Sequence, residues 1–348
     1  MRCWFVKFLL ANALACLVFS VVGYFYYFGG LGIEPPIADE VWKRATPNGR
    51  VSRCVEGAVS VRLDANGYNN EYYRDAKREL TDVDALVMGS SHVEGFNLNK
   101  PFVYLLNERF ADSEETKSFY QCGASSHTLV ASLARYEDAL KLFRPKRYVL
   151  VETCFAPDLN EIRQALNDEV KNRPAPAALR PWFSRVWGLT WGLGRLNQYF
   201  AFRATRDGEA NAAPTSESRK ALEAGWTELA RRVVEISRRY GVRPIFFFHL
   251  NANLGPNGEY SPRPEVENLP AFRAICEREG IVFVDATERF RREYEERDVW
   301  HYGFGNAGII SGHLNRDGHR AVADVLEETI RRLDAKNDAK TTERSDDI

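Results

Sequence analysis

Short apolar runs and amphipathic stretches alternate along the chain from about residue 84 onward. The apolar runs predict strands at residues 85–88, 118–121, 147–152, 245–248 and 281–284. The amphipathic stretches predict helices at residues 129–142, 218–240, 269–279 and 316–333. Several runs are apolar on both faces, as in strands that are covered by helices on either side. We therefore expect an α/β domain with a mostly parallel sheet over residues 84–335.

A long uncharged segment, residues 8–33, precedes this domain. About 20 apolar residues span a bilayer, whereas the apolar run of a cleavable signal has about 7–15. The segment continues into aromatic residues 24–28, which are typical of a membrane interface. Arg2 and Lys7 precede it, and the first charges after it are acidic. We expect residues 1–33 to form an uncleaved single-pass anchor in the plasma (inner) membrane; a removed signal and a buried core helix are the alternatives. The positive-inside bias puts the N-terminus in the cytoplasm and the rest outside.

Three other segments interrupt or flank the alternation. Residues 34–83 lack clear periodicity and are interpreted as a linker and N-terminal extension. Residues 160–215 are an insertion crowded with aromatic side chains, which predicts either a local core or a surface that faces a membrane or a partner. Residues 336–348 are polar and predict a disordered tail.

Composition excludes several classes of function. The 348 residues carry 47 Lys and Arg against 48 Asp and Glu, and this balance argues against a nucleic-acid-binding protein. Six cysteines are too sparse for a disulfide scaffold, and no pair has zinc-finger spacing. We therefore expect neither a metal nor an organic cofactor.

Polar residues gather where the predicted strands end, which is where sites lie in open α/β sheets. Histidine is scarce, with six in the chain, yet five of the six belong to this set. The set comprises Ser90, Ser91, His92, Cys122, Gly123, Ser125, Ser126, His127, Glu152, Thr153, Cys154, Asp158, His249, Asn251, His313, Asn315, Asp317 and His319. A serine at a strand-to-helix turn is a candidate nucleophile, and it needs a histidine as general base.

The pairing of an early Gly89-Ser90-Ser91 with a late His313-Leu314-Asn315 resembles the SGNH (GDSL-like) hydrolase superfamily over residues 84–333. The resemblance implies a three-layer, flavodoxin-like fold, with Ser91 as nucleophile and His313 as base. It also implies an oxyanion hole that uses the amides of Ser91 and Gly123. The N-terminal anchor and the G-S-S start look like the extracytoplasmic branch, which includes alginate-type O-acetyltransferases and proteins of teichoic-acid D-alanylation.

The chain departs from the superfamily pattern at two places. The position three residues before His313, where the superfamily has an acid, is Ile310. We take Asp317 as the acid, with Asp158, Glu152 or a Ser-His dyad as alternatives. The third-block asparagine is also missing, and Asn251 or a backbone amide is the candidate replacement in the oxyanion hole.

Several of these candidate site residues also have a structural explanation. Ser91 suits a helix N-cap, and His313 suits a loop histidine bound to a carbonyl. His319 lies on the last helix and is interpreted as a packing or surface residue. His92 and His127 either shape the site or are solvated. Cys122 and Cys154 follow neighbouring predicted strands, and we expect either an extracytoplasmic disulfide between them or two buried thiols.

Together these features predict a membrane-anchored serine esterase or O-acyltransferase that acts on an acyl ester of an envelope glycan. Its partners would be an acyl donor, a glycan acceptor and a membrane-bound O-acyltransferase. Two alternatives stay open: a catalytically weak or inactive protein that serves in binding or assembly, and a lipase-like enzyme whose aromatic insertion touches lipid.

Overall fold

The computed structural model of the chain falls into two units, Pro35–Arg173 with Ser216–Ile348, and Met1–Glu34 with Pro174–Thr215. The residues described here are 7, 11–15, 17–18, 48, 50–53, 57, 59–70, 83–95, 97–111, 117–124, 128–153, 156–166, 216–249, 252–254, 260–262, 267–305 and 312–346. The sheet and every site residue discussed below belong to the first of these units.

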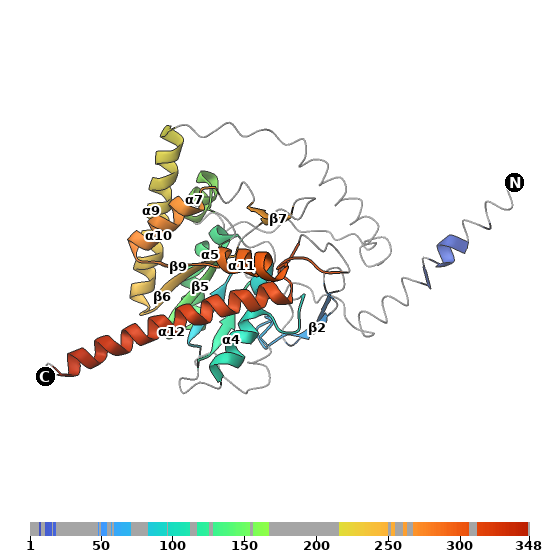
Figure 1. Cartoon of the computed structure of the whole chain (residues 1–348), viewed down its shortest axis with the longest axis horizontal. Helices are drawn as coiled ribbons and strands as arrows, with labels where there is room; N and C mark the ends of the chain where they lie inside the picture. The colour runs from blue at the N-terminus through green and yellow to red at the C-terminus, as the bar shows by residue number, and fades with distance from the viewer. Residues whose placement is uncertain are drawn as a thin grey trace. The chain divides into compact units, whose positions relative to one another are not determined.

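A five-stranded parallel sheet with the order β4-β3-β5-β6-β9 forms the centre of this unit (Figure 1). Its strands are β3 (Ala85–Met88), β4 (Phe119–Gln121), β5 (Tyr148–Thr153), β6 (Arg243–Phe248) and β9 (Val282–Asp285). Every side chain of β3 and β5 is buried, as expected of strands covered on both faces. The predicted mostly parallel α/β sheet is therefore present.

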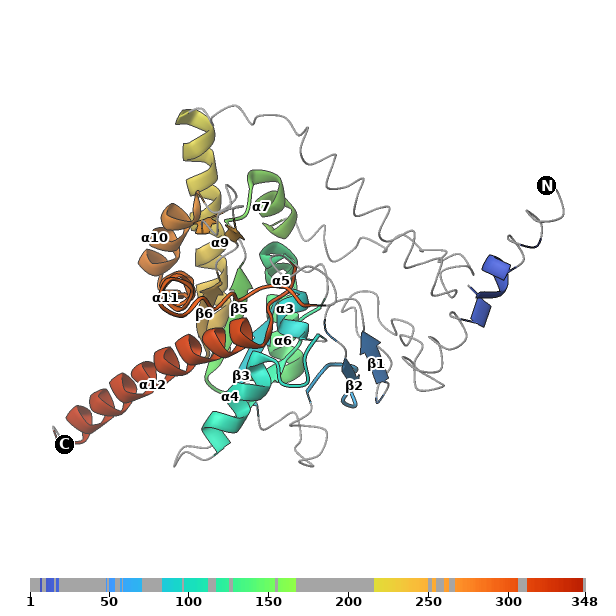
Figure 2. The same cartoon turned by 45° about the vertical axis from the view of Figure 1, so that its right-hand side comes forward.

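Helices cover both faces of the sheet, and neighbouring phenylalanines of β6 mark the two sides. Phe247 packs against Phe102 of α4 (Phe102–Ala111), whereas Phe246 packs against Phe272 of α10 (Leu269–Glu279). Helix α12 (Arg316–Asp346) contacts α4 on the first face, and α9 (Ser216–Arg239) contacts α10 on the second (Figure 2). The remaining helices are α3 (Ser91–Glu94), α5 (Leu129–Ala134), α6 (Tyr136–Phe143), α7 (Leu159–Leu166) and α11 (Thr287–Arg297).

Residues 59–70, which lie in the predicted linker and N-terminal extension, pack on the domain. This segment contains β2 (Val59–Arg62), which pairs with β1 (Arg50–Arg53) in an antiparallel hairpin. The buried Asp64 carboxylate accepts hydrogen bonds from the Tyr120 hydroxyl and from Asn70. The polar sequence hides this role because buried polar side chains satisfy one another here instead of forming an apolar run.

The helix predictions need two corrections. Residues 129–142 form two helices, α5 and α6, since the backbone leaves helical geometry at Arg135. The predicted tail is helical as far as Asp346, as part of α12. No Gly or Pro follows Gly318 within α12, so the sequence contains no strong stop signal.

A second antiparallel pair, β7 (Ala252–Leu254) and β8 (Tyr260–Pro262), lies beyond β6.

No helix among the described residues is long and apolar enough to cross a bilayer. Of the predicted anchor, residues 11–15 and 17–18 are described; they are helical, and Leu14, Leu17 and Val18 are exposed. The rest of the segment 8–33 and residues 167–215 of the aromatic insertion lie outside the described residues.

Candidate active site

Ser91 opens the short helix α3, directly after the turn that follows β3. The N-cap is Ser90, whose hydroxyl accepts a hydrogen bond from the His92 amide at 3.3 Å. Gly95 ends the helix in the left-handed region, with φ of 64°. Ser90, and not Ser91, therefore caps this helix, and the Ser91 side chain remains available for another contact.

His313 provides that contact: its Nε2 lies 2.7 Å from Ser91 Oγ. The histidine precedes α12 in a loop that is fixed by backbone pairing with residues 301–303. Tyr302 and Leu314 form an antiparallel bridge, and the Gly303 amide donates to the His313 carbonyl at 2.9 Å. Two residues 222 positions apart are thus brought within hydrogen-bonding distance, as the spacing of a Ser-His pair requires.

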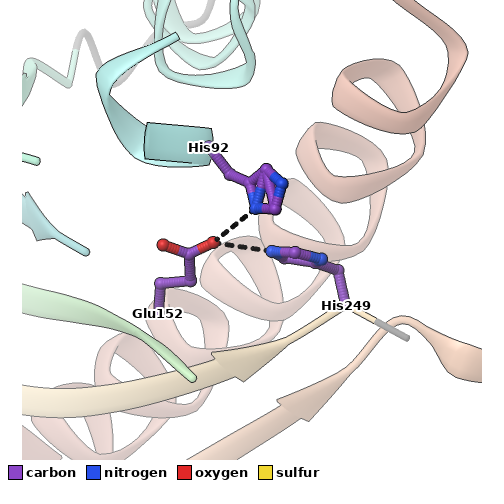
Figure 3. A group of neighbouring side chains, drawn as sticks. All are labelled: His92, Glu152 and His249. Atoms are coloured by element: carbon purple, nitrogen blue, oxygen red, sulfur yellow. Dashed lines mark hydrogen bonds and ion pairs between the residues drawn. The ribbon is translucent and has the colours of Figure 1, made fainter. Parts of the chain in front are cut away.

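A buried carboxylate lies beneath the nucleophile turn. Glu152 is the next-to-last residue of β5 and is 2% exposed. Its Oε2 accepts a hydrogen bond from the Ser90 amide at 2.6 Å, and its Oε1 lies 2.6 Å from His249 Nε2 (Figure 3). Burial alone would raise the pKa of Glu152, but His92, His249 and the Ser90 amide outweigh it and lower the pKa to about 2. The carboxylate is therefore ionised at neutral pH.

Gly89 makes room for this carboxylate. A Cβ atom at position 89 would overlap Glu152 Oε2 and lie 2.6 Å from Glu152 Cβ. Real Cβ atoms do not approach other atoms so closely, and the Glu152 backbone is held in the centre of the sheet. The glycine of the G-S-S motif is thus required by packing against Glu152.

His92 lies between the buried carboxylate and the Ser-His pair. Its Nδ1 is 3.3 Å from Glu152 Oε1, and its ring centroid is 5.1 Å from that of His313. Burial lowers the pKa of His92 well below its usual value, against an opposing effect of Glu152. The ring is therefore neutral, and its position indicates that it shapes the site rather than lying in solvent.

The side chains of His92, Glu152 and His249 include the donor types that bind zinc, and their ligand atoms lie within 4.8 Å of one another. The contacts favour a hydrogen-bonded cluster instead. The 2.6 Å from Glu152 Oε1 to His249 Nε2 fits an N–H···O bond, and His249 Nδ1 already lies 2.9 Å from the Tyr302 hydroxyl. Among the buried side-chain atoms of the cluster, His92 Nδ1 is the one that lacks a hydrogen-bond partner within the described part of the chain.

The structure gives the other predicted site residues different partners. The Asp317 carboxylate pairs with Arg320 at 2.9 Å on the first turn of α12. The Gly123 amide donates to Gln121 Oε1 at 2.9 Å, and its role in an oxyanion hole stays a prediction. Asp158 exchanges hydrogen bonds with Glu161 in a capping box at the start of α7. Asn251 lies outside the described residues.

The remaining candidates are structural or undescribed. His319 Nδ1 accepts a hydrogen bond from the Phe102 amide at 3.1 Å, and burial lowers the pKa of His319 to about 3, so it packs as a neutral ring. Cys122 is a free, buried thiol, and burial raises its pKa. Its proposed partner Cys154 and the candidate His127 lie outside the described residues.

Sequence reasoning missed the pairing of Glu152 with His249 and the contact of His249 with Tyr302. Glu152 lies at the end of β5 and His249 directly follows β6, and the two strands are neighbours, since Thr153 is in register with Phe248. A polar residue at the end of each apolar run was the available signal. The order of the strands, which the sequence does not reveal, decides that these two ends are adjacent.

No family model matches the sequence, and no curated protein sequence matches it. Among solved structures, the chain is similar to an acetyl xylan esterase, AlAXEase, with a TM-score of 0.40 and 12% identity, covering 71% of this chain and 99% of that one. It is also similar to the esterase EstA from Pseudoalteromonas sp., with a TM-score of 0.38 and 13% identity, covering 72% and 98%. A member of the lipolytic G-D-S-L family from Veillonella parvula gives a TM-score of 0.35 and 11% identity, covering 71% and 98%.

Proposed function

We propose that the chain is a serine esterase or O-acyltransferase that works through an acyl-Ser91 intermediate. The observation that carries this proposal is the 2.7 Å distance between His313 Nε2 and Ser91 Oγ. At this distance an unprotonated imidazole can take the hydroxyl proton while the oxygen attacks an acyl carbonyl. A hydroxyl without such a base is a weak nucleophile at neutral pH.

The reaction proceeds in two halves. Ser91 Oγ forms a bond to the acyl carbon as its proton moves to His313, and the carbonyl oxygen becomes an oxyanion. His313 then returns the proton to the leaving alkoxide as the ester bond breaks. In the second half, a sugar hydroxyl or water attacks the acyl carbon while His313 accepts its proton. The bond between the acyl carbon and Ser91 Oγ then breaks, and His313 returns the proton to Ser91 Oγ. The Ser91 amide, on the first residue of α3, is the oxyanion donor in this proposal.

The finer parts of the proposal rest on the sequence. The uncharged segment at residues 8–33 supports an extracytoplasmic domain held at the inner membrane by a single span. A tether of this kind raises the effective concentration of a membrane-bound acyl donor. We therefore propose an acyl ester of an envelope glycan as the substrate class and a membrane-bound O-acyltransferase as the partner.

Covalent labelling tests the proposal directly. The full-length chain is incubated with a fluorophosphonate, and the adduct is located by intact-mass and peptide-mass measurement. We expect one adduct on Ser91 in the wild type, none in Ser91→Ala and a much slower reaction in His313→Ala. Hydrolysis of a chromogenic acetyl ester should fall by about 10³-fold or more in both variants.

The competing function is an inactive protein that only binds or assembles other components. A folded wild-type chain that forms no adduct and hydrolyses no ester would contradict the catalytic proposal and favour this alternative. Circular dichroism and thermal unfolding of each variant establish that it is folded. The close Ser91–His313 contact is the observation that favours the enzyme over the inactive protein.

A further inference from the structure

A chain of hydrogen bonds leads from the nucleophile turn away from Ser91 and His313. It begins at the Ser90 amide, which donates to Glu152 Oε2 at 2.6 Å. Glu152 Oε1 lies 2.6 Å from His249 Nε2, and His249 Nδ1 lies 2.9 Å from the Tyr302 hydroxyl. The three side chains of this hydrogen-bond chain are buried: Glu152 and His249 are each 2% exposed, and Tyr302 is 6% exposed.

The chain ends in the loop that carries the general base. Tyr302 forms the backbone bridge with Leu314, the residue next to His313. On either side of this bridge, the Gly303 amide donates to the His313 carbonyl at 2.9 Å, and the Asn315 amide donates to the His301 carbonyl at 3.0 Å. The nucleophile turn and the base loop are therefore joined by a second connection besides the Ser91–His313 contact.

We propose that Glu152, His249 and Tyr302 are positioning residues that hold the Ser90-Ser91 turn and the His313 loop in register, with Glu152 as the buried charge of the site. This inference rests on the proposed function. No carboxylate stands three residues before His313, where Ile310 lies, and the carboxylate of Asp317 pairs with Arg320. Glu152 supplies the missing charge from the end of a different strand.

The ionisation of Glu152 sets the direction of each bond. An ionised carboxylate only accepts, so the Ser90 amide and His249 Nε2–H both donate to it. In the tautomer whose proton is on Nε2, His249 Nδ1 is the acceptor for the Tyr302 O–H. This order fixes the tautomer and orientation of His249, much as a carboxylate orients an active-site histidine.

The charge of Glu152 acts on the base through a short path. His92 Nδ1 lies 3.3 Å from Glu152 Oε1, and the His92 ring packs edge-on against His313. His313 becomes positively charged when it takes the Ser91 proton. A buried anion one imidazole away stabilises that positive charge more than an anion in water would.

Two tyrosine variants separate a positioning role from a merely structural one. Tyr302→Phe removes only the hydroxyl that bonds His249. The matched control is Tyr136→Phe, since the Tyr136 hydroxyl is also buried and lies 2.8 Å from Ser237 Oγ, away from the site. We expect both variants to lower the melting temperature, but only Tyr302→Phe to lower kcat, by about 10-fold with KM unchanged.

Glu152→Gln tests the charge. We expect kcat to fall by about 100-fold, because the amide cannot accept from both the Ser90 amide and His249 as the carboxylate does. The acid limb of the pH profile of kcat/KM should also move to lower pH, since a neutral amide no longer favours the protonated base. An unchanged acid limb in a folded Glu152→Gln enzyme would contradict the role of the charge.

The outcomes distinguish this inference from the proposed function. Absence of a Ser91 adduct in the wild type defeats the proposed function. A wild type that forms the adduct, together with equal kcat values for Tyr302→Phe and Tyr136→Phe, defeats the inference alone. Loss of wild-type activity in EDTA that returns with added Zn²⁺ would also overturn it, in favour of a metal at His92, Glu152 and His249.

Discussion

Because residue 89 is a glycine, the buried Glu152 carboxylate can lie directly against the nucleophile turn. The glycine lets the nucleophile turn approach the carboxylate closely enough for the Ser90 amide to donate at 2.6 Å. An amide hydrogen bond to a buried carboxylate is among the stronger kinds in proteins. The turn is therefore held by a charge, in addition to the cap that Ser90 provides.

Replacing Gly89 by alanine should damage both stability and activity. The new Cβ must displace Glu152 or the turn, and overpacking of this kind costs about 1–3 kcal/mol in the free energy of unfolding. Denaturant titration and ester hydrolysis measure the two effects. Gly305→Ala is the control, because a Cβ at that position meets no atom of the described part of the chain within 4 Å.

A double variant checks the cause of the Gly89→Ala loss. In a Glu152→Ala background the carboxylate is absent, so the additional loss of stability from Gly89→Ala should be smaller. Fully additive losses would show that the alanine acts through Val93 and the Cβ of residue 152, which also lie close to this position, and not through the carboxylate.

At the scale of single elements, α12 is tied to the base loop by one side chain. Asn315 Oδ1 accepts from the amides of Asp317 and Gly318, each at 3.0 Å, and Asn315 Nδ2 donates to the Trp300 carbonyl at 2.7 Å. One end of the amide thus caps the helix while the other end holds the strand-like segment that pairs with His313.

Two substitutions separate these tasks. Asn315→Asp keeps the capping oxygen and loses the donor to Trp300, whereas Asn315→Ala loses both. We expect Asn315→Ala to lower the free energy of unfolding by about 1–2 kcal/mol and Asn315→Asp to retain most of the helix-capping part. Urea titration measures both values, and equal losses in the two variants would be evidence against the cap.

The strand and helix predictions succeeded where the hydrophobic pattern is regular. The run at residues 245–248 lies in β6, and the stretch at 269–279 is helix α10 to the residue. The pattern failed where polar side chains satisfy one another, as at Asp64 and Asn70. It also missed the break at Arg135, because an amphipathic stretch retains its period through a single non-helical residue.

Across the whole molecule, buried ionisable groups make stability depend on pH. The folded state lowers the pKa of His319 to about 3, whereas an unfolded histidine titrates near about 6.5. Between these two pKa values the unfolded chain therefore binds one proton more than the folded chain. Over this range His319 changes the free energy of unfolding by about 1.4 kcal/mol per pH unit. Stability from His319 is complete above about pH 6.5 and is lost as the pH falls toward 3.

Glu152 adds a second loss at lower pH, because its pKa falls from 4.5 to about 2 on folding. Urea titrations at pH 7, 6 and 5 cover the range in which His319 contributes, together with His92 and His301, whose pKa values burial also lowers. His319→Gln offers a neutral acceptor to the Phe102 amide and should have a shallower pH dependence than the wild type. Identical slopes for the two proteins would mean that His319 is not the group that titrates.

The candidate site could be predicted only in part from the sequence, for a topological reason. Ser91 and His313 follow from motif and order along the chain, and the structure places them in contact. The role of Glu152 depends on strand order, because β5 lies between β3 and β6 and its last residues are next to both. A linear sequence contains no local signal for that adjacency, so Asp317 stood out as the nearer acid.

The segment at residues 59–70 affects how readily copies of the chain associate through the edge of the sheet. Strand β4 is an edge of the sheet, and Asn70 uses its amide to bond both the N–H and the carbonyl of Gln121, at 2.9 and 3.0 Å. A side chain thus occupies the groups through which another chain would add a strand. A shortened chain that begins at residue 84 would expose the N–H and carbonyl of Gln121, although Asn107 would still bond those of Phe119. It should associate through the exposed part of this edge more readily than the longer chain, even with Ser91 and His313 intact.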